Sequence, residues 1–146
     1  MARDLQVITA SLERAVVSLK EARDFFNNVA RHEAAESLTY RMAQAGFIQH
    51  FEFTFELARN IIQRWLHERA PKREDVDLPV TRRDLFRFAA RAGLIQNPES
   101  WFAYADARNA SSHTYNAAIA RDVRVQAEAF VEDVHILLAR SRSGDD

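Results

Sequence analysis

With 146 residues, 47% of them hydrophobic and 28% charged, the chain is long enough to form one globular domain with its own core. It contains no cysteine, which excludes disulfides, thiol chemistry and cysteine-based zinc sites. Its net charge of −1 is unlike that of proteins that grip long nucleic acids non-specifically, so any contact with nucleic acid must be local.

The first two predicted elements are long helices. Apolar residues recur every three or four positions over residues 4–28, as on one face of an amphipathic helix. A second helix is expected over 37–70, with Ser37 as its N-cap and Pro71 as its end. Within it, residues 51–56 alternate like a strand, but helical patterns flank them without turn residues. We therefore expect a helix whose phenylalanines cover more than one face, one toward its own bundle and one toward another subunit.

Shorter helices follow a charged loop over residues 71–80. Thr81 is expected to cap a short helix that ends at Gly93, and Asn97 with Pro98 begins the next one. The last helix is expected over about 116–140.

With only 3 glycines and 3 prolines, the chain has few of the turn residues that a β-sandwich or an α/β fold needs. The predicted fold is all-α, an up-and-down helical bundle of four to five helices. We expect a single domain over residues 1–140 and a disordered tail over 141–146.

No apolar run approaches the roughly 20 residues that a membrane span needs, and the first residues lack the apolar core of a signal peptide. We therefore expect a cytoplasmic protein that does not contact the membrane.

The segment 106–115 concentrates groups that could carry chemistry. Arg108 offers a planar fork of donors that suits phosphate, and His113 can exchange protons near neutral pH. Together they are the minimum set for metal-free RNA cleavage. In a continuous helix, however, they would lie about 140° apart. A structural role for Arg108, paired with Glu52 or Glu56 of the long helix, therefore stays open.

Three arginines, Arg83, Arg87 and Arg91, recur every four residues on the short third helix. This basic ridge is either a solvated face or a surface that contacts phosphate or an acidic partner. The other histidines show no metal-ligand spacing, and the chain has no glycine-rich phosphate loop. We expect no metal and no organic cofactor.

Four features occur in order along most of the chain: FIQHFEFTFELA (47–58), AARAGLI (89–95), Trp101 and RNASSHTY (108–115). In this combination the chain resembles the nucleotidyltransferase substrate-binding family, a branch of the HEPN superfamily close to the HepT toxins. The resemblance covers about residues 5–140. It implies a HEPN-like homodimer that binds a minimal nucleotidyltransferase encoded nearby.

The resemblance also assigns roles to the motif Arg, four residues, His, one residue, Tyr, which falls on Arg108, His113 and Tyr115. It implies a metal-independent ribonuclease site in which Arg108 and His113 act on RNA across the dimer, so that the offset within one helix no longer forbids a site. Tyr115 would accept AMP from the nucleotidyltransferase, which would silence the activity.

Three functional hypotheses follow. The first is a ribonuclease toxin of a toxin–antitoxin pair, with Arg108 and His113 as catalytic residues. The second is a non-catalytic subunit that presents a substrate or nucleotide to its nucleotidyltransferase, and the third is a plain helical adaptor. The supporting residues expected around the site are Asn109, Ser112, Glu52 and Glu56.

Overall fold

The computed structural model describes residues 2–69 and 82–143, which form five α-helices and one 3-10 turn and, in these two ranges, no strand. The elements are α1 (Ala2–His32), α2 (Leu38–Arg69), α3 (Arg82–Arg91), α4 (Pro98–Ala110), the 3-10 turn η1 (Ser111–His113) and α5 (Ala117–Ser143). The prediction of an all-α bundle is confirmed.

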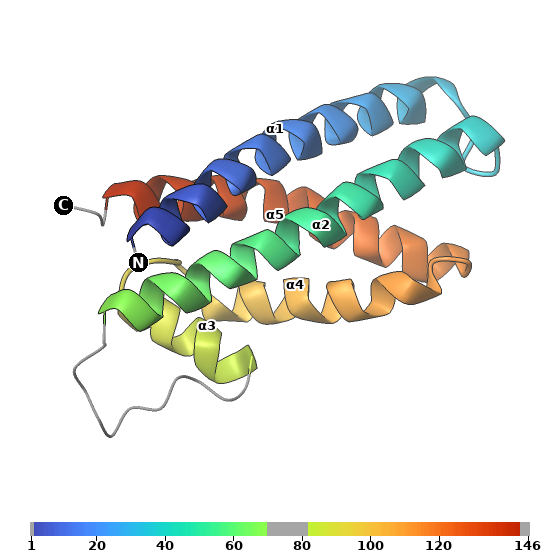
Figure 1. Ribbon diagram of the computed structural model, residues 1–146. Helices are drawn as coiled ribbons and strands as arrows, with labels where there is room; N and C mark the ends of the chain where they lie inside the picture. The colour runs from blue at the N-terminus through green and yellow to red at the C-terminus, as the bar shows by residue number, and fades with distance from the viewer. Residues whose placement is uncertain (1, 70–81, 144–146) are drawn as a thin grey trace.

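The long helices run up and down beside one another (Figure 1). Helices α1 and α2 form a hairpin, α5 packs against both of them, and α4 packs against α5 and α2. The short α3 lies outside this bundle, against α2 and α4. The start of α1 and the end of α5 lie at one end of the bundle, and η1 lies at the opposite end, near the α1–α2 connection (Figure 1).

Side-chain caps fix where three helices begin. The Ser37 hydroxyl accepts a hydrogen bond from the Tyr40 N–H at 3.1 Å in the first turn of α2. The Asn97 side chain accepts from the N–H of residue 99 at 3.0 Å, with Pro98 in the first turn of α4. Asn116 caps α5 in the same way, at 2.9 Å. The predicted caps at Ser37 and Asn97 are therefore confirmed.

Gly93 ends α3 as the sequence predicts. Its φ of +83° lies in the left-handed region, which a residue without a Cβ adopts at low cost. The Leu94 N–H donates to the Ala89 carbonyl at 2.9 Å, and the Gly93 N–H donates to the Ala90 carbonyl at 3.0 Å. These two bonds form a Schellman motif, which satisfies carbonyls that the end of a helix leaves open.

Helix α5 continues three residues beyond its expected end at residue 140. Ser141 is buried, and Arg142 Nη2 lies 2.6 Å from Glu13 Oε1 of α1. Because these contacts hold the last turn against α1, residues 141–143 belong to the domain and not to the expected disordered tail.

The end of α1 also differs from expectation. Helix α1 ends at residue 32 instead of residue 28. The expected helix end at Pro71, the loop over 71–80, the cap at Thr81 and the tail residues 144–146 lie outside the described residues.

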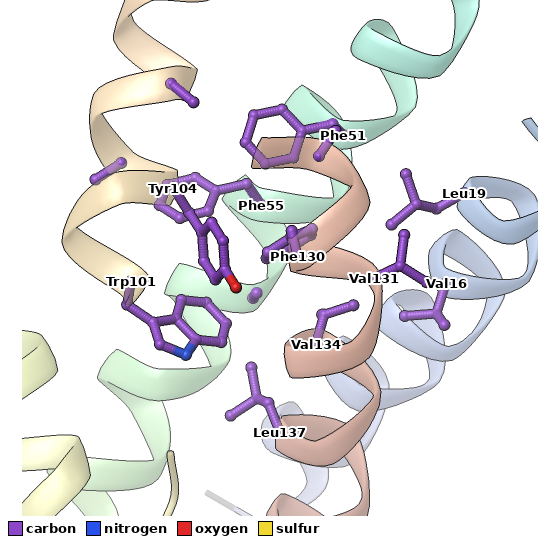
Figure 2. Packing of buried hydrophobic residues seen from close by; sticks show 14 of the residues in the cluster. Val16, Leu19, Phe51, Phe55, Trp101, Tyr104, Phe130, Val131, Val134 and Leu137 are labelled. Atoms are coloured by element: carbon purple, nitrogen blue, oxygen red, sulfur yellow. The ribbon is translucent and has the colours of Figure 1, made fainter. Parts of the chain in front are cut away.

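An aromatic cluster forms the centre of the core, where α2, α4 and α5 meet (Figure 2). The Phe130 ring of α5 lies at its middle, 5.2 Å from the Phe51 ring, 5.6 Å from Trp101 and 5.3 Å from Tyr104 between centroids. Rings in such edge-to-face pairs attract one another beyond the burial of their area. Phe55 completes the cluster, 6.0 Å from Phe130.

The phenylalanines of residues 51–56 lie on opposite sides of α2, as a helix requires. Phe51 and Phe55 are 0% and 2% exposed, whereas Phe53 is 61% exposed. The strand-like alternation therefore belongs to a helix with one apolar face in the core and an apolar side chain on its outside.

Tyr104 joins α4 to α5 at the edge of this cluster. Its hydroxyl donates a hydrogen bond to the Asp133 carboxylate. Burial raises the pKa of Tyr104 well above its usual range, and the hydrogen bond to Asp133 raises the pKa further.

Candidate active site

Arg108 lies in the last turn of α4 and extends to α2, where two carboxylates one turn apart receive its guanidinium. Its Nε lies 3.3 Å from Glu56 Oε2, and its Nη1 lies 3.6 Å from Glu52 Oε2. The second oxygen of Glu56 pairs with Arg59 Nη2 at 2.8 Å. We call these four residues the glutamate–arginine cluster. Its two positive charges offset the repulsion between glutamates at i and i+4.

The ion pairing expected from the sequence is therefore present, and it holds only part of the Arg108 side chain. The contact between Nε and Glu56 is electrostatic, because Nε makes no hydrogen bond within the described chain. The side chain is 34% exposed, so it remains open to an anion from solvent.

Ser111 links the Arg108 guanidinium to the Glu52 carboxylate through hydrogen bonds. It begins the 3-10 turn, and its buried hydroxyl accepts a hydrogen bond from Arg108 Nη1 at 3.2 Å. The hydroxyl proton is donated to the Glu52 carboxylate, and the Arg108 carbonyl lies within reach of it at 2.7 Å. A charged acceptor makes the stronger bond, so the bond to Glu52 is favoured.

His113 and Tyr115 form a second, exposed pair just beyond Ser111. The Tyr115 hydroxyl lies 3.4 Å from His113 Nδ1, and the two rings meet edge to face at 5.8 Å. A separation of 3.4 Å makes a weak hydrogen bond. Both side chains are exposed, and Tyr115 is 86% exposed, so both can meet a ligand or another protein.

The helix does not continue from Arg108 to His113, because α4 ends at Ala110 and the tighter 3-10 turn follows. The offset of about 140° expected for a continuous α-helix therefore does not describe this segment. Within the described chain, no hydrogen bond joins Arg108 to His113. The single chain presents an anchored guanidinium and an exposed imidazole as two neighbouring groups.

The other residues singled out from the sequence lie around this site or away from it. Asn109 and Ser112 are exposed, and the Ser112 hydroxyl donates to the Asn109 carbonyl at 3.2 Å. The ridge of α3 lies against aromatic rings. The guanidinium carbons of Arg83 and Arg87 lie 4.7 and 5.5 Å from the centre of the Phe102 ring, and that of Arg91 lies 5.5 Å from the Phe88 ring. Such stacking gives these arginines a structural role.

Ser111 is the site residue that the sequence reasoning missed. Its signal is its spacing of three residues from Arg108, which places both side chains on one side of a continuing helical turn. No group of three or more histidine, aspartate or glutamate side chains is placed to hold a metal ion in residues 2–69 and 82–143. In the same ranges, no helix is long and apolar enough to span a membrane.

The bundle and this site define an all-helical protein with an anchored arginine and an exposed histidine–tyrosine pair at one end. Residues 8–143 match the family described as "nucleotidyltransferase substrate binding protein like", and the chain belongs to this family. A Haemophilus influenzae protein named "Probable ribonuclease HepT" is 34% identical over 132 residues, which are 90% of this chain and 85% of that protein. The family predicted from the sequence motifs is therefore confirmed.

Solved structures agree with this assignment. A Haemophilus influenzae structure, described as revealing the fold of a substrate-binding domain of a nucleotidyltransferase, superposes with a TM-score of 0.70 and 32% identity. The match covers 97% of this chain and 99% of that one. A Thermus thermophilus protein superposes with a TM-score of 0.68 over 90% of this chain and 98% of its own, but at 23% identity it supports the fold alone.

Proposed function

We propose that this chain is the HEPN-type partner of a minimal nucleotidyltransferase and, as a homodimer, a metal-independent endoribonuclease that acts as the toxin of a toxin–antitoxin pair. The observation that carries the proposal is the exposed imidazole of His113, 3.4 Å from the Tyr115 hydroxyl and one 3-10 turn beyond the anchored Arg108. The name of the Haemophilus influenzae relative supports the reaction, and the family description supports the partner.

The chemistry needs only a base and a cation beside one phosphate. The His113 imidazole removes the proton of a ribose 2′-hydroxyl, and the 2′-oxygen attacks the adjacent phosphorus. The bond from phosphorus to the 5′-oxygen breaks, a cyclic phosphate forms, and the departing oxygen takes up a proton. Arg108 stabilises the charge on the phosphoryl oxygens through Nη2, which makes no hydrogen bond within the described chain.

An exposed apolar stripe on α2 supports the homodimer. Leu38, Met42 and Phe53 are 62%, 65% and 61% exposed, and with Gly46 they fall within about 80° of the helix circumference. We call these four residues the outer stripe of α2. Glu56, three residues after Phe53, belongs to the glutamate–arginine cluster. A second copy seated on the stripe would therefore meet this site at its edge.

Gly46 gives independent support for a close neighbour at this stripe. A Cβ added at Gly46 would meet nothing within 4 Å, so packing within the chain does not require a glycine. A glycine inside a helix costs about 0.5–1 kcal/mol relative to alanine. Its use on the outer stripe is explained if the backbone of a second helix approaches there.

Modification of Tyr115 would silence such a site. The exposed hydroxyl can attack the α-phosphorus of ATP held by the nucleotidyltransferase, with pyrophosphate as the leaving group. The attached AMP would place a negative charge and a bulky group beside His113, where it repels and obstructs the phosphate of an RNA substrate.

The proposal is tested with purified chain and single-stranded RNA in the presence of EDTA. We expect cleavage by the wild type and a loss of at least about 100-fold for His113→Ala and for Arg108→Ala. His135→Ala, on α5, serves as the matched control. No cleavage by the wild-type dimer, or equal cleavage by His113→Ala, would contradict the ribonuclease activity.

The second candidate is a non-catalytic subunit that presents a substrate or nucleotide to the nucleotidyltransferase. The description of the matched family and of the Haemophilus influenzae structure favours it. It predicts co-purification with the nucleotidyltransferase, binding of that enzyme's substrate, and no RNA cleavage under the conditions given above.

A further inference from the structure

A hollow of about 720 Å³ lies between the first half of α2, the turn after η1 and the start of α5, and Tyr115 forms part of its wall. Pockets that hold small molecules have volumes of about 300–1,000 Å³. We call it the Tyr115 hollow. It lies next to the proposed ribonuclease site, but none of the residues that the sequence analysis singled out, apart from Tyr115, lines it.

The charge of the Tyr115 hollow is strongly positive for a chain whose net charge is −1. Three arginines line it, Arg41 from α2 and Arg121 and Arg124 from α5, against one carboxylate, that of Glu36. Alanine side chains and the buried Ile48 form much of the remaining wall. A hollow with an apolar wall and several guanidinium groups suits a ligand that has a flat apolar part and a phosphate.

Two of the arginines are held in place by their own chain. Arg124 Nε donates to Gln44 Oε1 at 3.2 Å, and its guanidinium carbon lies 5.0 Å from the centre of the Phe26 ring. Arg41 Nε donates to the Glu36 carbonyl at 3.2 Å. In the described part of the chain, the Nη groups of both arginines make no hydrogen bond, so these groups remain available to an anion.

Arg121 is exposed, and it differs from the other two because it makes no hydrogen bond or ion pair with the described residues. The first residues of α5, Ala117 and Ala118, line the hollow as well, and the start of a helix carries a partial positive charge. The arginines, the cavity and this helix end all favour the same chemistry.

Deepening the function proposed above, we infer that the Tyr115 hollow is a subsite for one nucleoside monophosphate. The arginines bind its phosphate, and the apolar wall holds its base. Two sources can supply this unit, either the AMP attached to Tyr115 or one nucleotide of an RNA chain that enters the neighbouring site.

The first experiment measures binding of AMP to the purified chain by calorimetry and by NMR, following the amides of Ala117 and Ala118. We expect AMP to bind at least about tenfold more tightly than adenosine, which lacks the phosphate. We expect Arg121→Glu to weaken AMP binding by about tenfold or more, because it replaces a free cation by an anion.

Arg14→Glu, an equal charge change on an exposed arginine of α1, is the matched control and should leave AMP binding unchanged. Circular dichroism confirms that each variant is folded. No AMP binding by the wild type, equal binding of adenosine and AMP, or equal weakening by both variants would overturn the subsite.

The second experiment identifies the source of the nucleotide. In a Tyr115→Phe background, we measure binding of a short RNA with a 2′-deoxy sugar at its cleavage position. If Arg121→Glu weakens this binding about tenfold, the hollow holds a nucleotide of RNA. If RNA binding is unchanged but Arg121→Glu, made in the chain that retains Tyr115, slows AMP transfer to Tyr115 by the nucleotidyltransferase, the hollow holds the attached AMP. If Arg121→Glu changes neither RNA binding nor AMP transfer, the inference is overturned.

These outcomes are independent of RNA cleavage. A chain that binds AMP in the hollow but cuts no RNA would retain the subsite and lose the ribonuclease proposal. A chain that cuts RNA but binds no AMP would retain the ribonuclease proposal and lose the subsite.

Discussion

The hydroxyl of Ser111 is the link between Arg108 and Glu52, because it accepts from the guanidinium and donates to the carboxylate. We expect Ser111→Ala to lower the free energy of unfolding by about 1–3 kcal/mol, since it removes the hydrogen bonds that the hydroxyl makes to two charged, partly exposed side chains. Urea denaturation measures this change.

The neighbouring Ser112 provides the control, because its exposed hydroxyl bonds only a backbone carbonyl. We expect Ser112→Ala to change the free energy of unfolding by less than about 0.5 kcal/mol. Similar losses for the two variants would contradict the structural role assigned to Ser111.

Tyr104 makes the folded state less stable at alkaline pH. The unfolded chain releases the Tyr104 proton near its ordinary pKa of 10.0, whereas the folded chain retains the proton to higher pH. The stability from this group is therefore complete below pH 10 and is lost as the pH rises further, by up to about 1.4 kcal/mol per pH unit.

We expect Tyr104→Phe to lose less stability than the wild type between about pH 9.5 and 11, because it has no such proton to release. Urea midpoints measured at several pH values test this difference, and Tyr40→Phe, the same change on α2, is the control. Parallel pH profiles for wild type and Tyr104→Phe would contradict the pKa shift.

The sequence could single out the residues proposed to act at the site but not their connections. The residue types of Arg108 and His113 were enough to propose a phosphate site, and the role of Tyr115 came from the family resemblance. The pairing of Arg108 with Glu52 or Glu56 was kept as an alternative, and the structure shows it. Ser111 was missed because its role depends on where the α-helix gives way to a 3-10 turn. The Tyr115 hollow was missed because its arginines come from α2 and α5, which are far apart in the chain. Gln44 and Arg124, which form a hydrogen bond in its wall, are 80 residues apart.

At the scale of single helices, starts and stops were predictable wherever a local residue decides them. Ser37 and Asn97 cap their helices, and Gly93 ends α3, each through bonds within a few residues. The end of α5 was not predictable in this way, because the burial of Ser141 and the contact between Arg142 and Glu13 of a distant helix are not visible in the local sequence. Local signals fix an end only where tertiary contacts do not extend the helix.

The end of α3 gives a test of this local control. Gly93 has a φ of +83°, which a residue with a Cβ adopts only with strain. We expect Gly93→Ala to lower the free energy of unfolding by about 1–2 kcal/mol, and Gly93→Asn to cost less because asparagine tolerates this conformation better. Thermal or urea unfolding measures both, and equal stability of all three proteins would contradict the explanation.

At the scale of the whole molecule, the property to test is whether two copies of the chain form a dimer. Phe53 is 61% exposed on the outer stripe of α2, so Phe53→Asp removes no core contact. We expect this variant to remain folded and to become a monomer, because a buried carboxylate without a partner opposes association. Light scattering coupled to size-exclusion chromatography measures the mass.

The matched control for assembly is Val17→Asp, since Val17 is 54% exposed on α1 and is not part of this stripe. We expect Val17→Asp to leave the dimer intact. A wild-type monomer, or a Phe53→Asp variant that still forms the dimer, would contradict the face proposed for the second copy. Loss of RNA cleavage together with the dimer would show that two copies build the site.

The two ends of the helical bundle are spatially separate, and this has a practical consequence. The start of α1 and the end of α5 lie at one end, whereas η1 lies at the other (Figure 1). A helix of the length of α5 spans roughly 40 Å. A fluorescent label or an affinity handle attached beside either of these helix ends would therefore stand far from His113, and surface immobilisation through it would leave the end that carries His113 facing the solution.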